Sequence, residues 1–150
     1  MATVQRDWLD VTEERLREAG HRASAPRSSI IEVISRQECC LTAREIAERV
    51  RDDGREVGTA TVYRALELLH ALGAVQRLDT GDGFARYEPA EPSGEHHHHV
   101  LCDGCGGVFA FKDRALERAI HDLSERLVFD IAAHDVVLRG SCGSCTRPSG

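Results

Sequence analysis

The segment TATVYRALELLHALGAVQRLDTGDGFARYE, residues 59–88, carries the pattern that decides the fold of the first half of the chain. Its apolar residues recur at helical spacing from Val62 to Leu72, and Gly73 provides a C-terminal stop. Two short strand-like runs then flank a turn rich in glycine and aspartate, which predicts a β-hairpin. A helix that leads into such a hairpin is typical of a winged helix-turn-helix domain.

The residues before this segment predict further helices that would complete such a domain. One helix is expected over about residues 5–19, and a second begins near Pro26, because proline favours the first helical turn. A third begins at Thr42, whose spacing from Glu45 matches a capping box. We therefore predict a winged-helix DNA-binding domain over residues 1–88.

A change of composition separates this domain from the rest of the chain. The stretch PAEPSGE, residues 89–95, has two prolines and a glycine and predicts a hinge. The remainder, residues 96–150, has few large apolar residues, so we expect it to need zinc and a partner chain for stability. The predicted fold class is mixed α/β (α+β), with the winged helix-turn-helix domain followed by a small α/β dimerisation domain. In the latter we expect strands at 99–102 and 108–111, a helix at 113–127, and strands at 128–131 and 134–140.

Two Cys-x-x-Cys pairs lie at the two ends of this second part. Cys102 and Cys105 form one pair, and Cys142 and Cys145 form the other. Four thiolates in two such pairs are the ligand set of a tetrahedral structural zinc site. Buried free thiols or a redox pair are the alternatives, but a redox Cys-x-x-Cys usually opens a helix after a strand, which neither pair is predicted to do.

The first Cys-x-x-Cys pair follows four consecutive histidines in the stretch HHHHVLCDGCGG, residues 96–107. In an extended strand side chains alternate between faces, so His96 and His98 would point one way and His97 and His99 the other. One strand could then supply two different metal sites. A solvated polar run is the alternative interpretation, and the neighbouring cysteines favour metal binding over it.

Each histidine pair would need further ligands from elsewhere in the chain. Glu117 and His121 are four residues apart on the predicted helix and would share a face. The remaining candidates are His134 at the start of a predicted strand, Glu88 at the end of the hairpin, and Cys39 and Cys40 before the capping box. For the two cysteines, small residues of the core are the alternative interpretation.

Composition and charge restrict the classes of function. The net charge of −6 excludes a generally basic nucleic-acid binder, so any DNA contact must use a local patch. No apolar run approaches the roughly 18 residues of a membrane span, and the acidic N-terminal stretch is unlike a signal peptide. We therefore expect a cytoplasmic protein without a membrane partner, in which reduced cysteines favour metal over disulfides.

Together these motifs resemble the Fur family of metal-responsive bacterial repressors. Three segments carry the resemblance: TATVYRALELLHALGAV, HHHHVLCDGCGGVFAFKD and RGSCGSC. The resemblance implies a structural zinc ion on Cys102, Cys105, Cys142 and Cys145. It also implies a sensing site at the hinge, formed by Cys40, Glu88, His97 and His99. A further site in the dimerisation domain would use His96, His98, Glu117 and His134.

The sequence departs from the pattern of iron-sensing members at three positions. Cys40 replaces a common histidine, Ala110 replaces an acidic residue, and His98 replaces a frequent aspartate. Thiolate and imidazole ligands suit Zn²⁺ better than Fe²⁺, so the regulatory metal is expected to be Zn²⁺, as in zinc-uptake regulators. Glu88 stands where zinc regulators often have cysteine, which keeps Fe²⁺ as the alternative, and it counts against the peroxide-sensing branch, which prefers aspartate there.

The expected function is metal-dependent repression of metal-homeostasis genes by a homodimer on double-stranded operator DNA. The candidate DNA contacts are Tyr63 and Arg64 on the recognition helix, Arg27 for a phosphate, Arg22 for a minor groove, and Arg77 on the hairpin. A zinc hydrolase and a metal store are the alternatives. A hydrolase needs an open metal position, and the sequence has no His-Glu-x-x-His motif. We expect no small organic substrate.

Overall fold

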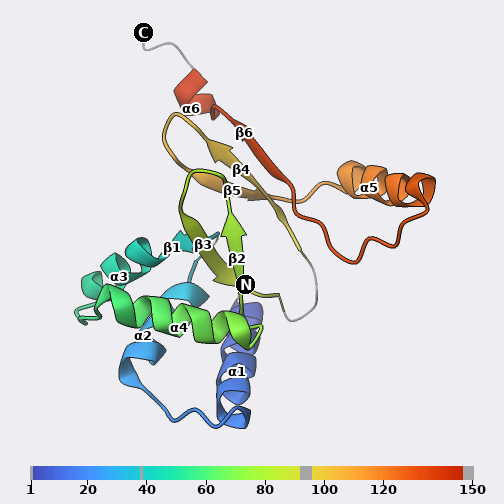
Figure 1. The fold of residues 1–150 in the computed structure, drawn as a ribbon. Coiled ribbons are helices and arrows are strands. Elements are labelled where there is room, and N and C mark those ends of the chain that lie inside the picture. Colours follow the sequence, from blue (N-terminus) through green and yellow to red (C-terminus); the bar gives the residue numbers. More distant parts are fainter. Residues whose placement is uncertain (1, 38, 92–95, 147–150) are drawn as a thin grey trace. The chain divides into compact units, whose positions relative to one another are not determined.

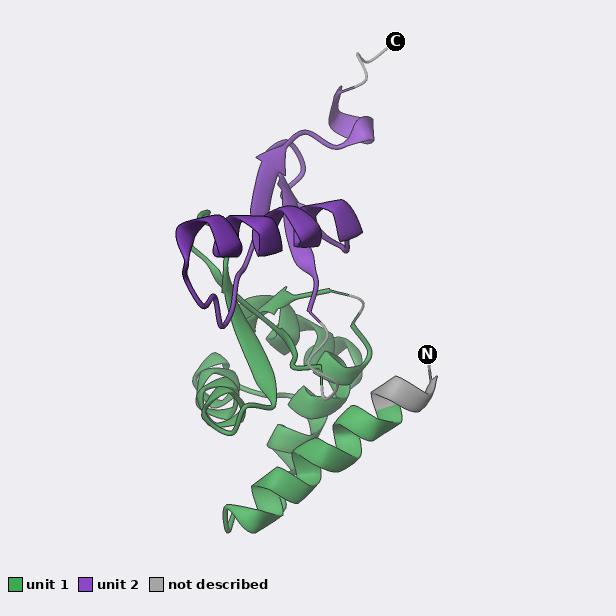
Figure 2. Ribbon diagram, turned by 90° about the vertical axis from the view of Figure 1, so that its right-hand side faces the viewer, with its two compact units in different colours: residues 1–95 green, residues 96–150 purple. Residues whose placement is uncertain are grey.

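The computed structural model describes residues 2–37, 39–91 and 96–146. The chain forms two compact units, residues 1–95 and residues 96–150 (Figure 2). Within the described ranges, no helix has both the length and the apolar character needed to cross a membrane. Each unit is described by itself below.

The first unit has the helix and hairpin order that the sequence predicts (Figure 1). Its helices are α1 (Ala2–Glu18), α2 (Ala25–Ser35), α3 (Ala43–Asp52) and α4 (Thr59–Ala71). The hairpin consists of β2 (Val75–Asp79) and β3 (Ala85–Pro89). This arrangement confirms the predicted winged helix-turn-helix fold.

Local sequence features account for the ends of these helices. The Thr42 side chain accepts a hydrogen bond from the backbone of Glu45, whose side chain accepts one from Thr42 N–H, so the predicted capping box is present. Pro26 lies in the first turn of α2, where its missing N–H is tolerated. Gly73 has a φ of +68°, a left-handed conformation that ends α4 with little strain.

A short strand that the sequence did not predict completes the first sheet. β1 (Leu41–Thr42) pairs antiparallel with β3, and the strand order is β1-β3-β2. Leu41 is the partner of Tyr87 in this register. Two residues are too few to show an alternating pattern, so only the tertiary pairing reveals this strand.

A single apolar cluster joins the helices and the sheet of the first unit. Ile30, Ile46 and Leu66 are fully buried within it. The α1 helix is tied to the end of α4 through Trp8, whose indole N–H donates to the Ala74 carbonyl at 2.8 Å. The first unit therefore has a closed core of its own.

The second unit contains a three-stranded sheet and two helices. The strands are β4 (His98–Cys102), β5 (Val108–Phe111) and β6 (Val137–Gly140), in the order β5-β4-β6. β4 pairs antiparallel with β5 and parallel with β6. The helices are α5 (Arg114–Leu127) and the short α6 (Gly143–Thr146), which the sequence did not predict.

The predicted strand at residues 128–131 is wrong. Val128 caps α5 in a left-handed conformation with φ 51°, and Phe129 N–H donates to the Ser124 carbonyl at the helix end. Valine and phenylalanine favour strands, but here they terminate the helix. His134, expected to open a strand, instead lies in the loop before β6.

The first two residues of the predicted hinge are ordered parts of the first unit. Pro89 is still part of β3, and Ala90 N–H donates to the Ala74 carbonyl at 2.9 Å. Both residues therefore belong to the first unit. The rest of the predicted hinge includes residues 92–95, which lie outside the described residues.

Candidate metal centres

The four cysteines of the two Cys-x-x-Cys pairs converge in the second unit. Cys102 ends β4 and Cys105 follows in the next turn, while Cys142 precedes α6 and Cys145 lies in it. The expectation that neither pair opens a helix after a strand is therefore wrong for Cys142 and Cys145, which follow β6 at the start of α6. Their sulfur atoms all lie within 4.8 Å of one another. A tetrahedral ion with Zn–S bonds of about 2.3 Å needs sulfur atoms about 3.8 Å apart. The cluster therefore fits a closed four-thiolate zinc site.

The backbone around these cysteines is shaped for close approach of the two pairs. A Cβ atom at Gly104 would lie 2.9 Å from Cys145 Sγ, so a side chain at that position would intrude on the sulfur cluster. Cys142 N–H donates to Cys102 Sγ at 3.2 Å. This bond, with that from Cys105 N–H, lowers the pKa of Cys102 to about 6 and favours its thiolate.

The pKa of the Cys145 thiol is shifted in the opposite direction. Hydrogen bonds with the Cys142 and Cys102 side chains raise the pKa of Cys145 to about 12. The raised pKa favours the thiol form of Cys145. Binding of a divalent ion at this thiol would release its proton, as expected for a thiolate site.

A second donor cluster in the same unit joins β4, α5 and the loop before β6. His98 Nε2 lies 2.5 Å from Glu117 Oε1, and His134 Nε2 lies 3.0 Å from Glu117 Oε2. His96 Nε2 lies 3.1 Å from His134 Nε2 and 3.5 Å from Glu117 Oε2. A tetrahedral ion with Zn–N bonds of about 2.0 Å needs ligand atoms about 3.3 Å apart. Three imidazoles and one carboxylate therefore present the spacing of a zinc site.

Local interactions orient this cluster. Val136 N–H donates to His98 Nδ1 at 3.3 Å, which turns Nε2 toward Glu117. The hydrogen bond from His98 is the main cause of a lowered pKa at Glu117, and the nearby His134 adds to it. The carboxylate is therefore held in the charged form that a cation requires.

The predicted pairing of alternate histidines is seen in the ring positions. The ring centroids of His96 and His98 are 5.1 Å apart, and those of His97 and His99 are 4.8 Å apart. His98 and His99 are both buried, whereas His96 is exposed. Only His98 and His99 lie in β4, so alternation within the strand applies directly to these two, while His96 and His97 precede it.

The first unit brings two of the predicted hinge ligands together. Leu41 pairs with Tyr87 at one end of the β1–β3 pairing, and Cys40 and Glu88 are the residues that follow at that end. Both side chains are buried. Hydrogen bonding with Cys39 and burial raise the pKa of the Cys40 thiol, and the negative charge of Glu88 adds to this effect.

His121 does not join the histidine cluster, although it shares a face of α5 with Glu117 by spacing. Its side chain is 73% exposed, and its Nε2 lies 3.6 Å from Glu125 Oε1, one turn along the helix. Helical spacing alone therefore identified Glu117 as a member of the cluster but could not separate it from His121.

The candidate DNA contacts lie at the surface of the first unit. Tyr63 and Arg64 are exposed on α4, and Arg64 Nη2 donates to Thr61 Oγ1 at 3.4 Å. Arg22 and Arg77 are also exposed, whereas the half-buried Arg27 donates to the Arg22 carbonyl. All five positions are in the first unit, and helix-turn-helix domains in general read DNA with their second helix, which corresponds here to α4.

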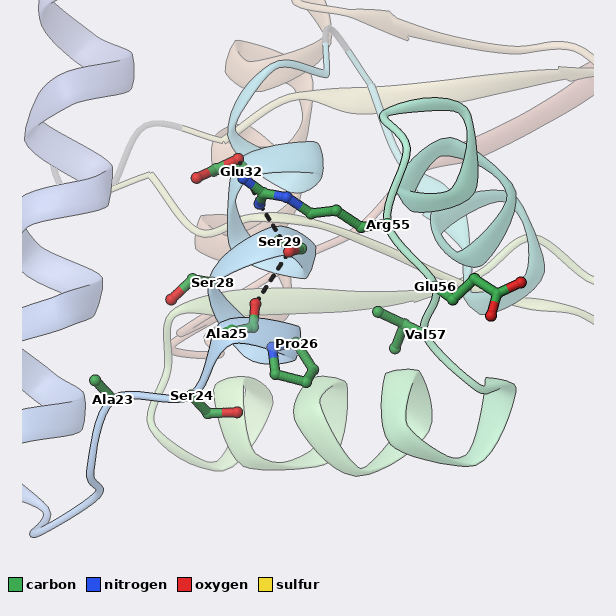
Figure 3. Close-up of a pocket in the computed structure, with 10 residues that line it drawn as sticks. All are labelled: Ala23, Ser24, Ala25, Pro26, Ser28, Ser29, Glu32, Arg55, Glu56 and Val57. Atoms are coloured by element: carbon green, nitrogen blue, oxygen red, sulfur yellow. Dashed lines mark hydrogen bonds and ion pairs between the residues drawn. The ribbon is translucent and has the colours of Figure 1, made fainter.

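Two interactions of the first unit were missed at the sequence level. Arg55, after α3, donates to Ser29 Oγ at 2.8 Å and borders a pocket of about 620 Å³ at the start of α2 (Figure 3). In the hairpin, the buried Arg86 donates to Asp82 through two nitrogens, at 3.0 and 2.8 Å. Neither pair has a local spacing that distinguishes it from ordinary surface charge.

Comparison with known proteins identifies the family. The sequence pattern of the "Ferric uptake regulator family" matches residues 18–139. The chain belongs to this family. It is 35% identical over 138 residues to the ferric uptake regulation protein of Vibrio anguillarum, covering 89% of this chain and 91% of that protein.

Solved structures support the same assignment. The chain resembles the ferric uptake regulator of Vibrio cholerae, with a TM-score of 0.77 and 32% identity, covering 86% of this chain and 98% of that one. It also resembles a zinc-bound manganese uptake regulator, with a TM-score of 0.74 and 27% identity, covering 87% and 98%. This Fur-family protein is thus a metal-dependent transcriptional regulator, and members of the family are regulators and not enzymes.

Proposed function

We propose that this Fur-family protein is a cytoplasmic, zinc-dependent repressor of metal-homeostasis genes, switched by metal at a hinge site. The proposed ligands are Cys40 and Glu88 from the first unit and His97 and His99 from the second. The observation that supports the proposal is the pairing of β1 with β3. Leu41 is the partner of Tyr87, so the adjacent residues Cys40 and Glu88, 48 positions apart in sequence, follow at the same end of that pairing.

The proposed switch follows from where these ligands lie in the chain. Two of them belong to the DNA-binding unit, and two belong to the unit that follows the hinge. An ion that binds all four favours the relative orientations of the two units in which they can meet. When operator DNA requires the same orientation that the ion favours, metal binding strengthens DNA binding by linkage.

The donor types favour Zn²⁺ over Fe²⁺. One thiolate, two imidazoles and one carboxylate complete a tetrahedral zinc site, whereas Fe²⁺ prefers more oxygen ligands and a higher coordination number. The zinc-bound regulator with 27% identity shows that a related fold can bind zinc. Iron is the second candidate, because Glu88 supplies an oxygen and the Vibrio anguillarum relative bears the name of a ferric uptake regulation protein.

We propose that the two clusters whose residues all come from the second unit hold further metal ions. The four cysteines would hold a structural zinc ion, since a closed tetrahedral site leaves no position for exchange. The cluster of His96, His98, Glu117 and His134 would hold a second regulatory or structural ion, either Zn²⁺ or Fe²⁺.

A homodimer through the second unit is supported by the surface of α5. None of its residues is buried, although its sequence is strongly amphipathic. Leu123, Leu127 and Phe129 are 41%, 60% and 67% exposed. A surface of this kind marks an interaction site, and regulators of this family are dimers. Leu127→Asp should therefore yield monomers in sedimentation velocity at micromolar concentration, whereas the exposed-site change His121→Ala should leave the dimer intact.

On DNA, we propose that α4 enters the major groove. Tyr63 and Arg64 would contact bases and phosphates, Arg27 would contact a phosphate, Arg22 would reach the minor groove, and Arg77 would contact DNA from the hairpin. The two α4 helices of a homodimer would then bind the two half-sites of a double-stranded operator.

The deciding experiment is an anaerobic titration of operator DNA by fluorescence anisotropy, with free Zn²⁺ or Fe²⁺ buffered near cytosolic levels. We expect Zn²⁺ to raise operator affinity and Fe²⁺ to have little effect. Cys40→Ser should weaken the zinc response, while the matched variant His121→Ala should respond like the parent, because His121 lies outside the donor clusters of the second unit. Activation by Fe²⁺ and not by Zn²⁺ would assign the switch to iron, and DNA binding that ignores both metals would contradict metal-dependent repression.

A further inference from the structure

We propose that Cys39 is a second thiolate ligand of the regulatory metal, so that the first unit alone presents a dithiolate to a soft divalent cation such as Zn²⁺. The inference rests on the proposed function in one respect, namely that Cys40 belongs to the regulatory site. It adds a ligand that the Fur-family resemblance did not supply, since that resemblance points only to position 40.

The backbone before β1 brings both thiols to one side. In an extended strand, adjacent side chains point to opposite faces. The chain instead bends at Cys39, before β1 begins at Leu41. As a result, Cys39 Sγ and Cys40 Sγ lie 3.7 Å apart. The bend therefore removes the alternation that would separate two neighbouring cysteines.

The distance between the sulfur atoms matches that of a shared metal ion. Two thiolates bound to one tetrahedral zinc ion at about 2.3 Å are separated by about 3.8 Å. The observed 3.7 Å is close to this value and much longer than a disulfide bond of about 2.05 Å. Little movement of either side chain would be needed to bind such an ion.

The surroundings of the pair differ from those of ordinary core cysteines. Cys40 is buried, yet it lies outside the apolar cluster that contains the adjacent Leu41. Cys39 is half-buried and therefore accessible to an incoming ion. The buried Glu88 follows Tyr87, the strand partner of Leu41. Two sulfur atoms this close form a partial ligand set, which packing of small apolar side chains does not explain.

A second thiolate would change the metal selectivity of the site. Soft thiolate ligands select Zn²⁺ and disfavour Fe²⁺ and Mn²⁺, which prefer carboxylates and water. With Cys39 bound, the regulatory site would have two thiolates in place of one, and a tetrahedral ion would then bind only two of Glu88, His97 and His99. Discrimination against iron would then depend on Cys39 as much as on Cys40.

Cobalt provides the test, because thiolate ligands give Co²⁺ an intense charge-transfer absorption that grows with their number. Full-length protein that retains its structural zinc is titrated anaerobically with Co²⁺ in the presence of a phosphine reductant, and the difference spectrum is recorded. We expect the band per bound cobalt to fall by about half in Cys39→Ser and in Cys40→Ser, and to vanish in the double variant. Zinc affinity of Cys39→Ser, from chelator competition, should fall at least about tenfold, the lower limit for loss of even an outer-shell partner.

Controls separate ligand loss from damage to the fold. Elemental analysis of each variant should still give one structural zinc ion per chain, and the emission of Trp8, the one tryptophan of the sequence, should report an intact first unit. Cys39→Ala provides a second substitution without the serine hydroxyl and should give the same loss of absorption.

The outcomes distinguish this inference from the proposed function. A Cys39→Ser protein with the full band and unchanged zinc affinity would overturn the role of Cys39 while leaving the hinge site with Cys40 in place. A parent protein without any thiolate band, together with an unaffected Cys40→Ser variant, would remove both cysteines from the site and with them the proposed zinc hinge.

Discussion

The first unit buries an apolar cluster of eighteen residues, whereas the described part of the second unit buries only Leu101, Cys102, His98 and His99. The difference extends to the helices. The α3 helix of the first unit buries four residues, while α5 of the second buries none. The second unit instead brings eight candidate metal ligands together in two clusters. One unit is thus built around a hydrophobic core, and for the other we propose that metal ions and a partner surface supply the missing stability.

The largest effect should come from removing the structural zinc. In Cys142→Ser we expect the second unit to unfold, because zinc supplies about 10–16 kcal/mol in small zinc-dependent domains. The first unit should stay folded on its own core. Two-dimensional amide NMR would show loss of dispersion confined to the second unit, with Trp8 emission unchanged. A variant that lacks zinc and keeps a dispersed second unit would contradict the comparison.

A cavity in the core of the first unit should destabilise that unit and leave zinc binding by the second unit unchanged. Ile46 is 0% exposed, so Ile46→Ala should lower the free energy of unfolding of the first unit by about 2–5 kcal/mol. Urea denaturation followed by Trp8 emission measures this change, and zinc per chain should remain constant. On the same helix, the Arg44 side chain is 86% exposed, so Arg44→Ala should shift stability by less than about 0.5 kcal/mol.

A smaller effect is expected from the ion pair in the hairpin. Hydrogen bonding from Arg86 holds the pKa of Asp82 well below its usual range. The stabilisation is therefore present above the unfolded pKa of about 4 and is lost as the pH falls through the lower folded value. Asp82→Asn should cost about 2 kcal/mol at neutral pH, because Arg86 is buried and loses its charged partner.

The pH dependence provides the check on this pair. The difference in unfolding free energy between the parent and Asp82→Asn should be constant near neutral pH and shrink below about pH 4. Urea titrations at pH 7, 5 and 3 would measure it. A difference that grows as the pH falls would show that Asp82 is not stabilised by Arg86.

The smallest change in stability should accompany a large change in DNA binding. Tyr63 and Arg64 are exposed on α4, so their replacement by alanine should alter the unfolding free energy by no more than about 0.5 kcal/mol. Each substitution should weaken operator binding by about 1–3 kcal/mol, or about 5- to 150-fold, as expected for loss of a base contact. Anisotropy titrations would measure this effect, and metal content should not change. Parent-like operator affinity in both variants would show that another face of the first unit reads DNA.

Much of the fold could be predicted from the sequence because its determinants are local. The capping box at Thr42, the stop at Gly73 and the turn of the hairpin act within a few residues. The two Cys-x-x-Cys pairs and the alternation of His96 to His99 likewise depend on short spacings. Such patterns indicate which donors belong together within one segment, and they predicted the fold class that the structure shows.

Local spacing did not determine the long-range partners of those donors, which only the family resemblance implied. Their actual contacts were decided by the tertiary structure: β1 pairs with β3 beside Cys40 and Glu88, and the loop before β6 brings His134 to Glu117. Residues 128–131 end α5 instead of forming a strand. The physical reason is that strand pairing and loop placement depend on contacts between residues far apart in sequence, whereas helix caps and ligand spacings are set by immediate neighbours.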